Sequence, residues 1–202
     1  MRLDLLLINI AILAPAVILH ECAHGWVAYK LGDPTAKNLG RLTLNPLKHI
    51  DPFGTVLLPL LLWWQGFTPI GWAKPVPINP MNLSSPKRDM MWVGLAGPAV
   101  NIALAVVLSI FLKLNLVGGL VRSTIELAVY MNLFLAIFNL IPIPPLDGSR
   151  FVVGLLPNKY AYLYSRLEPY GIFIVMLLFV GGKFQRFLIP VVDLIASYLG
   201  VH

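Results

Sequence analysis

Residues 20–26, His-Glu-Cys-Ala-His-Gly-Trp, combine side chains that can bind a metal ion with one that can move a proton. Positions four apart share one face of a helix, so His20 and His24 present two imidazoles to one point. Glu21, beside His20, can reach a water molecule held there. This arrangement is typical of a zinc site with a glutamate as general base, where zinc generates hydroxide from water at neutral pH. The spacing therefore predicts hydrolytic chemistry.

The residues around this motif are apolar, and so is most of the chain. Of its 202 residues, 58% are hydrophobic and only 12% are charged, which is more apolar than a soluble domain of this length requires. The composition predicts an integral membrane protein in a lipid bilayer, with no nucleic-acid partner for its net charge of +6. Ionisable groups are costly inside membrane helices, which favours a functional role for the motif over a chance polar cluster.

The elements that must position these groups are apolar helices. Three segments are long enough to cross a hydrocarbon core of about 30 Å, namely 5–31, 90–112 and 125–143. A shorter segment, 170–182, is expected to recruit residues upstream of Pro169. The tail at 187–201 is compatible with a span, a half-insertion or an interfacial position. The sequence thus predicts an all-α membrane protein, a bundle of about four to six transmembrane helices.

The region between the first two spans is irregular. Residues 51–64 are apolar but too short for a full crossing, which suits a re-entrant or interfacial segment. Residues 69–80 are rich in Pro, Val and Ile and have no helical period, which predicts an extended segment near the active site. We expect one membrane domain over 1–202, with a core at 5–150 and accessory helices at 160–202.

Basic residues are distributed unevenly between the two sides of this bundle. If residues 51–64 do not cross, the loops at 30–89 and 148–168 share one side. That side carries Lys30, Lys37, Arg41, Lys48, Lys74, Lys87, Arg88, Arg150, Lys159 and Arg166. By the positive-inside rule this side is cytoplasmic. The protein is therefore expected in the inner or plasma membrane of a cell, with the active site toward the cytoplasm.

Two histidines leave a catalytic zinc ion one protein ligand short. The third span runs from outside to inside, so Asp147, shortly after its end, reaches the depth of the two histidines. Gly148 gives the backbone freedom to turn this carboxylate inward. Asp33, Asp51 and His49 lie on the same side but in loops, where a turn or cap is the commoner role. The topology therefore favours Asp147 as the third ligand.

Two asparagines are expected at the same depth. Residues 94–101, Gly-Leu-Ala-Gly-Pro-Ala-Val-Asn, open the second span with small side chains that permit close helix packing. Asn101 is then a buried amide that either bonds to a neighbouring helix or holds substrate. Asn139, about two turns before Asp147, has the same two interpretations.

These motifs together resemble the site-2 protease family of intramembrane zinc metalloproteases. The resemblance rests on His-Glu-Cys-Ala-His at 20–24, Gly-Pro-Ala-Val-Asn at 97–101 and Asn-Leu-Ile-Pro-Ile-Pro-Pro-Leu-Asp-Gly at 139–148, in the order and on the spans typical of the family. It covers residues 5 to about 150 and corresponds to a compact form without a PDZ domain.

The resemblance implies a role for individual residues. Glu21 would be the catalytic base, and one zinc ion per chain would be bound by His20, His24 and Asp147. Asn139 would engage a membrane-embedded protein or peptide, cleaved in or near a transmembrane segment. The family also has an extended hairpin near its active site, where residues 69–80 lie in this chain. We therefore expect further substrate contacts at Gly71, Trp72 and Val76, with Asn101 as another candidate.

A metal-binding membrane protein or transporter, and a non-proteolytic homologue of the same fold, are the alternatives. A transporter would place polar residues along the depth of several helices, whereas this sequence gathers them at one level. Glu21 is not needed for simple coordination, so its presence favours catalysis. The sequence leaves open the physiological substrate, the oligomeric state, and whether 51–64 and 187–201 cross or re-enter the membrane.

Overall fold

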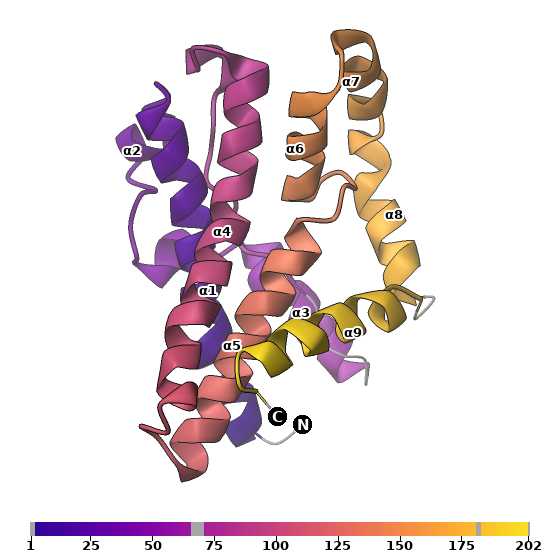
Figure 1. The fold of residues 1–202 in the computed structure, drawn as a ribbon. Coiled ribbons are helices and arrows are strands. Elements are labelled where there is room, and N and C mark those ends of the chain that lie inside the picture. Colours follow the sequence, from indigo (N-terminus) through magenta and orange to yellow (C-terminus); the bar gives the residue numbers. More distant parts are fainter. Residues whose placement is uncertain (1–2, 66–70, 181–182, 202) are drawn as a thin grey trace.

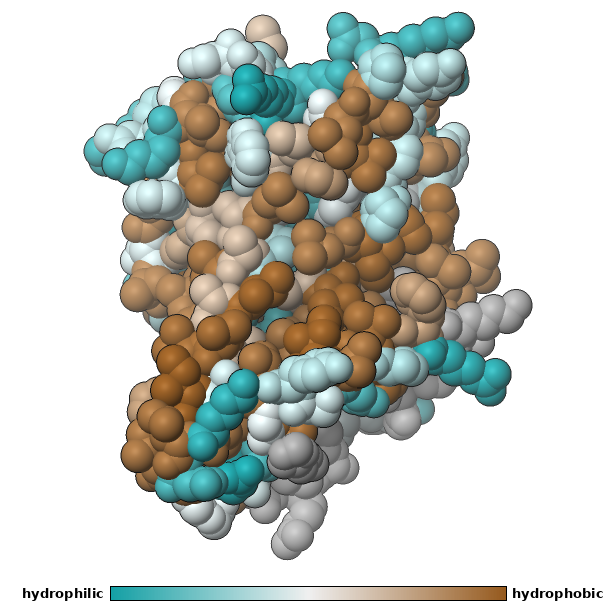
Figure 2. All heavy atoms as spheres, in the orientation of Figure 1, coloured by the Kyte–Doolittle hydropathy of each residue, from teal (hydrophilic) through white to brown (hydrophobic). Residues whose placement is uncertain are grey.

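The computed structural model describes residues 3–65, 71–180 and 183–201, which form helices and connecting segments without a strand. Three of these helices are long and apolar enough to cross a membrane, α1 (Leu3–Lys30), α4 (Pro86–Lys113) and α5 (Gly119–Asn139). Figure 2 shows hydrophobic side chains over the middle of the molecule and hydrophilic ones at the end that carries α2 (Thr35–Asn38) and α7 (Asn158–Ser165). The chain is an integral membrane protein, and the predicted all-α class is confirmed.

The spanning helices pack around α4. In Figure 1, α4 and α5 run antiparallel, and α4 also contacts α1 along its length. Pro86 suits the first turn of α4 because it has no N–H to leave unpaired there. One turn later, the Asp89 carboxylate accepts a hydrogen bond from the Ser85 backbone N–H at 2.7 Å, which satisfies a donor that precedes the helix.

Two predicted helix boundaries are wrong. α5 ends at Asn139 rather than at residue 143, because Ile141 precedes Pro142 and the residue before a proline is disfavoured in a helix. α8 (Glu168–Val180) has Pro169 in its first turn, so it takes just Glu168 from upstream of that proline. The upstream residues form α7 instead.

The region between α1 and α4 contains short helical segments besides α2. They are η1 (Pro46–Lys48), η2 (Pro52–Leu57), α3 (Leu58–Trp64) and η3 (Pro80–Asn82). Together η2 and α3 are apolar but shorter than a crossing, and they expose Trp63 and Trp64, as a re-entrant or interfacial segment would. Residues 71–79 carry no helix, as predicted, while positions 69 and 70 of the expected segment lie outside the described residues.

The C-terminal helix α9 (Lys183–Tyr198) lies across the α4–α5 pair rather than along it (Figure 1). One face of α9 is buried against α4 and α5. The apolar cluster that these three helices share comprises Ala105, Leu112, Val129, Leu133, Leu188, Val192 and Ala196. The short helix α6 (Asp147–Leu155) packs against α4 on the side of the hydrophilic end. This packing brings the start of α6 close to the second half of α1, where His20 and His24 lie.

Candidate active site

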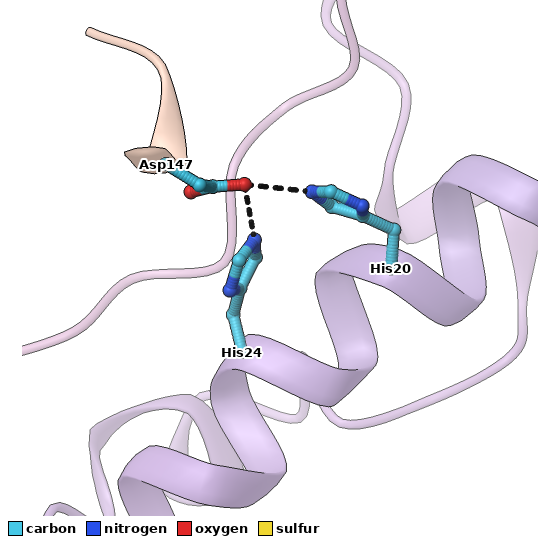
Figure 3. A group of neighbouring side chains, drawn as sticks. All are labelled: His20, His24 and Asp147. Atoms are coloured by element: carbon cyan, nitrogen blue, oxygen red, sulfur yellow. Dashed lines mark hydrogen bonds and ion pairs between the residues drawn. The ribbon is translucent and has the colours of Figure 1, made fainter. Parts of the chain in front are cut away.

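The two histidines of α1 point to one place. His20 and His24 lie one turn apart on the same helix face, and both side chains are almost completely buried. Figure 3 shows their rings facing the same carboxylate, that of Asp147. Burying three such polar groups is unfavourable unless they are paired or bind an ion. The helical spacing expected from the sequence is therefore present, with the imidazoles directed inward.

Asp147 is brought to this point by the turn that follows α5. The turn ends at the first residue of α6, which is Asp147 itself. Its Oδ2 lies 3.0 Å from Nε2 of His20 and 3.1 Å from Nε2 of His24. Among the described residues, this is the one group of three or more His, Cys, Asp or Glu side chains close enough to hold a metal ion.

Gly148 acts differently from the expectation that it lends the backbone freedom. It does not adopt a positive φ. A Cβ atom at this position would instead lie 2.1 Å from the carbonyl oxygen of Leu140, so a side chain would collide with the end of α5. Gly148 therefore permits the close contact between the end of α5 and the first turn of α6, and this contact fixes Asp147.

Helix α4 orients both imidazoles. Nδ1 of His24 lies 2.6 Å from the carbonyl oxygen of Val93, which can only accept, so Nδ1 carries the proton. Nδ1 of His20 lies 2.6 Å from Oδ1 of Asn101, and donation to this oxygen assigns the same tautomer. Each Nε2 is then free to offer its lone pair to a metal ion, the arrangement found around metal-binding histidines.

Asn101 belongs to a buried chain of amides. It is fully buried, and its Nδ2 donates to the carbonyl oxygen of Ala16 at 3.2 Å and to Oδ1 of Asn132 at 2.9 Å. Asn132, on α5, in turn donates to the carbonyl oxygen of Ala128. Asn132 is a residue of the site that the sequence motifs did not predict. Its signal was an amide within an apolar span, where a polar side chain needs a partner.

Glu21 lies at the same centre. A cavity of about 150 Å³ is lined by His20, Glu21, His24, Pro75, Val76, Ile78, Asn139, Pro145, Asp147 and Arg150. One oxygen of the Glu21 carboxylate, Oε2, accepts a hydrogen bond from the backbone N–H of Val76 at 2.8 Å. A carboxylate, a possible metal site and a water-sized space thus share one cavity.

The five residues expected to contact substrate divide into two groups. Asn139 and Val76 line the cavity. Asn101 lies outside the lining, bonded to His20. Gly71 and Trp72 also lie outside the cavity lining and pack against Gly54 of η2. A Cβ atom built on Gly54 would lie 2.3 Å from the indole of Trp72.

The alternative ligands considered from the sequence lie elsewhere. The Asp33 carboxylate accepts hydrogen bonds from Thr35, Asn79 and Asn82. Asp51 caps η2 by accepting from two backbone N–H groups. Nε2 of His49 lies 2.8 Å from the carbonyl oxygen of Thr43. All three side chains form hydrogen bonds within the segments between α1 and α4, in the turn or cap roles predicted from the sequence.

The charge at the site is concentrated on Asp147. Burial by itself raises the pKa of this carboxyl, but an imidazole that carries a proton on Nε2 outweighs that effect and holds the pKa below its usual range. In the tautomer suited to metal binding, Nε2 is instead unprotonated. Nη1 of Arg150 lies 3.6 Å from the other carboxylate oxygen, Oδ1. Asp147 is therefore an anion that offers Oδ2 to the site.

Comparison with known families identifies the class of protein. The family model described as peptidase family M50 matches residues 8–118 and 115–181, most of the chain. The chain belongs to peptidase family M50. This membership confirms the resemblance to site-2 proteases inferred from the three sequence motifs.

Individual relatives agree with the M50 assignment. YwhC of Bacillus subtilis (strain 168), provisionally named a zinc metalloprotease, is 40% identical over 171 residues, which are 80% of this chain and 75% of that protein. Rip2 of Mycolicibacterium smegmatis, named in the same way, is 28% identical over 92% of this chain and 71% of its own length. A zinc metalloprotease of Methanocaldococcus jannaschii is 31% identical over 74% of this chain and 34% of its own length. No solved structure gives a significant match.

Proposed function

We propose that this M50 protein is an intramembrane zinc metalloprotease that hydrolyses peptide bonds in or near transmembrane segments of membrane proteins. One observation carries the proposal: Glu21 shares a cavity with His20, His24 and Asp147, on a helix long enough to cross a membrane. Coordination alone does not require a free carboxylate beside the metal ligands, whereas hydrolysis requires a general base.

The residues of the site suit zinc. Two neutral imidazoles and one carboxylate, with a fourth position left for water, are a donor set of catalytic zinc sites. Tetrahedral zinc places its ligand atoms about 3.3 Å apart, and here the two Nε2 atoms lie 3.0 and 3.1 Å from Oδ2 of Asp147. When bound, zinc lowers the pKa of water to about 7 and polarises a carbonyl.

Glu21 is assigned the proton transfers. Its carboxylate takes a proton from the water that attacks the peptide carbonyl and delivers a proton to the leaving nitrogen as the C–N bond breaks. One water is consumed, and a carboxyl and an amine are formed. Asn139 lines the same cavity and uses one N–H of its amide on the carbonyl oxygen of Leu135. We assign its second N–H to a carbonyl oxygen of the substrate.

A substrate helix must unwind locally to expose a peptide bond, because a helical carbonyl is already hydrogen-bonded. We propose that the unwound backbone lies beside residues 71–79, whose Pro75, Val76 and Ile78 form one wall of the cavity. The backbone N–H groups of Trp72 and Lys74 donate to Gly54 and His49, so these donors are engaged within the protein. The carbonyl oxygens of Trp72, Lys74 and Pro75 also accept hydrogen bonds within the protein. The segment therefore guides substrate chiefly through its shape and its remaining carbonyl oxygens.

The proposed membrane orientation follows from the basic residues. The stretches at 30–89 and 148–168 carry ten of the chain's Lys and Arg residues, and the positive-inside rule makes the side on which they lie cytoplasmic. We accordingly propose an inner or plasma membrane location, with the active site toward the cytoplasm. Water would reach the cavity from that side.

A transporter would need polar groups along the depth of the spans. The buried polar side chains of the described spans, apart from Asp89 in the first turn of α4 and Ser109, are instead His20, His24, Asn101 and Asn132. Hydrogen bonds link His20, Asn101 and Asn132, and both histidines lie within 3.1 Å of Asp147, so these groups form one centre. This grouping favours one reaction centre over an ion path. A non-proteolytic homologue is separated from a protease by the experiment below.

The proposal is tested with protein purified in lipid nanodiscs, by zinc analysis and by cleavage of membrane-embedded peptides. The wild type should contain about one zinc per chain and cleave. Glu21→Gln keeps the shape but loses the base, so zinc should remain while cleavage falls by about 10²- to 10⁴-fold. Glu126→Gln, which disrupts an ion pair with Arg122 away from the cavity, is the matched control and should cleave normally. Cleavage by Glu21→Gln near the wild-type rate, or none by the wild type, would contradict the proposal.

A further inference from the structure

The base Glu21 is held by main chain from a distant part of the sequence. The Val76 N–H donates to Oε2 of Glu21 at 2.8 Å, across 55 positions of sequence. A hydrogen bond to one carboxylate oxygen fixes the orientation of the group and leaves the other oxygen, Oε1, for proton transfer. The position of residue 76 therefore determines where Glu21 can act.

Val76 is itself fixed by packing. Its side chain is 6% exposed, and its Cγ1 lies 2.7 Å from where a Cβ atom of Gly25 would be. Gly25 directly follows the metal-site residue His24. The extended segment thus rests on α1 beside the histidines, with its N–H directed at Glu21.

A buried arginine holds the same segment from outside the cavity. Arg41 is 8% exposed, and its Nη2 donates to the carbonyl oxygens of Lys74 at 2.9 Å and Pro75 at 3.2 Å. Its Nε is buried without a hydrogen-bond partner in the part of the chain that the structure describes. A buried cation that leaves a donor unpaired is costly, so its two bonds to consecutive carbonyls require an explanation.

Arg41 does not line the cavity, and the sequence predicted it only as one of the cytoplasmic charges. Its bonds end at residues 74 and 75, and the next peptide N–H along the chain is that of Val76. Arg41 and Glu21 are therefore linked through a single short piece of non-helical backbone. Because guanidinium is planar and rigid, it can fix this backbone more closely than a lysine would.

We propose that Arg41 is a positioning residue for the catalytic base: it clamps the backbone at 74–75 so that the Val76 N–H holds Glu21 in the orientation for proton transfer. This inference rests on the proposed protease function. The segment that flanks the substrate thereby also sets the geometry of the base.

A positioning role for Arg41 predicts a loss of kcat without a loss of folded protein or zinc, which a purely structural role does not predict. If Arg41 acts through Glu21, then Arg41→Gln lowers kcat by about 10- to 100-fold, since small displacements of a reacting group have effects of this size. KM, zinc content and thermal stability should stay close to those of the wild type. Arg41→Lys should be intermediate. Arg88→Gln removes an exposed arginine on the same side of the membrane and is the matched control, expected to leave kcat unchanged.

A second variant tests the proposal even where Arg41→Gln folds poorly. Incorporating the α-hydroxy acid of valine at position 76 by nonsense suppression turns the amide into an ester, which deletes the N–H and keeps the side chain. This ester should also lower kcat at constant zinc content, and valine incorporated by the same procedure is its control. Both Arg41 and the Val76 N–H are proposed to act by orienting Glu21. A variant that combines Arg41→Gln with the ester should therefore have a kcat no lower than that of the ester alone.

The outcomes separate the two hypotheses. Normal cleavage by the wild type together with normal kcat in the ester variant overturns the positioning role and leaves the protease proposal intact. Additive effects in the combined variant, or loss of zinc in parallel with kcat, overturn it as well. Absence of cleavage by the wild type overturns the protease proposal and this inference with it.

Discussion

Gly97 of α4 lies directly against the imidazole of His20. A Cβ atom built on Gly97 would be 2.5 Å from Nε2 of His20, and it would be equally close to Nε2 of His24. No side chain fits at such a distance, so α4 can approach the metal-binding face of α1 here because position 97 has no Cβ. This approach brings Val93 and Asn101 within hydrogen-bonding reach of the two rings.

Gly97→Ala should therefore disrupt the metal site. The added methyl group either rotates the imidazoles away or separates α4 from α1, and in both cases zinc affinity should fall by at least about tenfold. Zinc titration of the purified protein measures this. Gly118→Ala, at a position with open space around the added Cβ, is the control and should bind zinc normally. An unchanged zinc affinity in Gly97→Ala would contradict this prediction, because it would show that α1 and α4 accommodate the methyl group without moving the imidazoles.

Asn101→Ala should weaken zinc binding without removing a ligand. The substitution frees Nδ1 of His20 and leaves the carbonyl oxygen of Ala16 and Oδ1 of Asn132 without their donor. Loss of an orienting partner typically costs about 10- to 100-fold in metal affinity, and the unpaired buried groups cost about 1–3 kcal/mol of stability.

Zinc competition with a chelator measures the first effect of Asn101→Ala, and thermal unfolding measures the second. Ser109→Ala removes another buried hydrogen-bonding group of α4, one that bonds only within its own helix, and should leave zinc affinity unchanged. Equal affinity in the Asn101 and Ser109 variants would mean that Asn101 is only a helix contact.

Asp147→Ala should lose zinc. It deletes the carboxylate oxygen that faces both histidines, and two imidazoles alone bind zinc weakly at a site of this kind. Metal analysis after purification gives the zinc content. Asp51→Ala removes a carboxylate that caps η2 and should retain zinc. A full complement of zinc in Asp147→Ala would exclude Asp147 as a ligand.

Asp33 should stabilise the protein in a pH-dependent manner. Burial raises the pKa of its carboxyl, but hydrogen bonds from Thr35, Asn82 and Asn79 outweigh burial, so the folded-state pKa is lowered. A lowered pKa means that the stabilisation is fully present above the unfolded value of about 3.9 and is lost as the pH falls through the folded-state pKa.

Asp33→Ala should accordingly lower stability at pH 7 by about 1–3 kcal/mol, because the donors of Thr35, Asn79 and Asn82 lose their buried acceptor. The difference in the midpoint temperature of thermal unfolding between wild type and variant should become smaller below about pH 4. Glu168→Gln, at an exposed acid, should change stability little at any of these pH values. A difference that stays constant from pH 7 to pH 3 would contradict an ionised role for Asp33.

Some features follow from the chain alone because they are local or repeat regularly. The three spans depend on runs of apolar residues, and the facing of His20 and His24 depends on the period of a helix, so neither needs knowledge of the rest of the fold. Helix ends were less predictable. Whether a proline stops a helix, as at Pro142, or starts one, as at Pro169, depends on the register of the neighbouring turn.

The sequence by itself determined the membrane class, the histidine face, the adjacent glutamate and the depth at which Asp147 would serve as a third ligand. Only the tertiary structure decided which groups complete the site, because their contacts join residues that are far apart in the chain. Asn101 orients His20 across 81 positions, Val93 orients His24 across 69, and Val76 holds Glu21 across 55. A backbone N–H or carbonyl carries no residue-specific signal, so its part in a site emerges only when packing places it there.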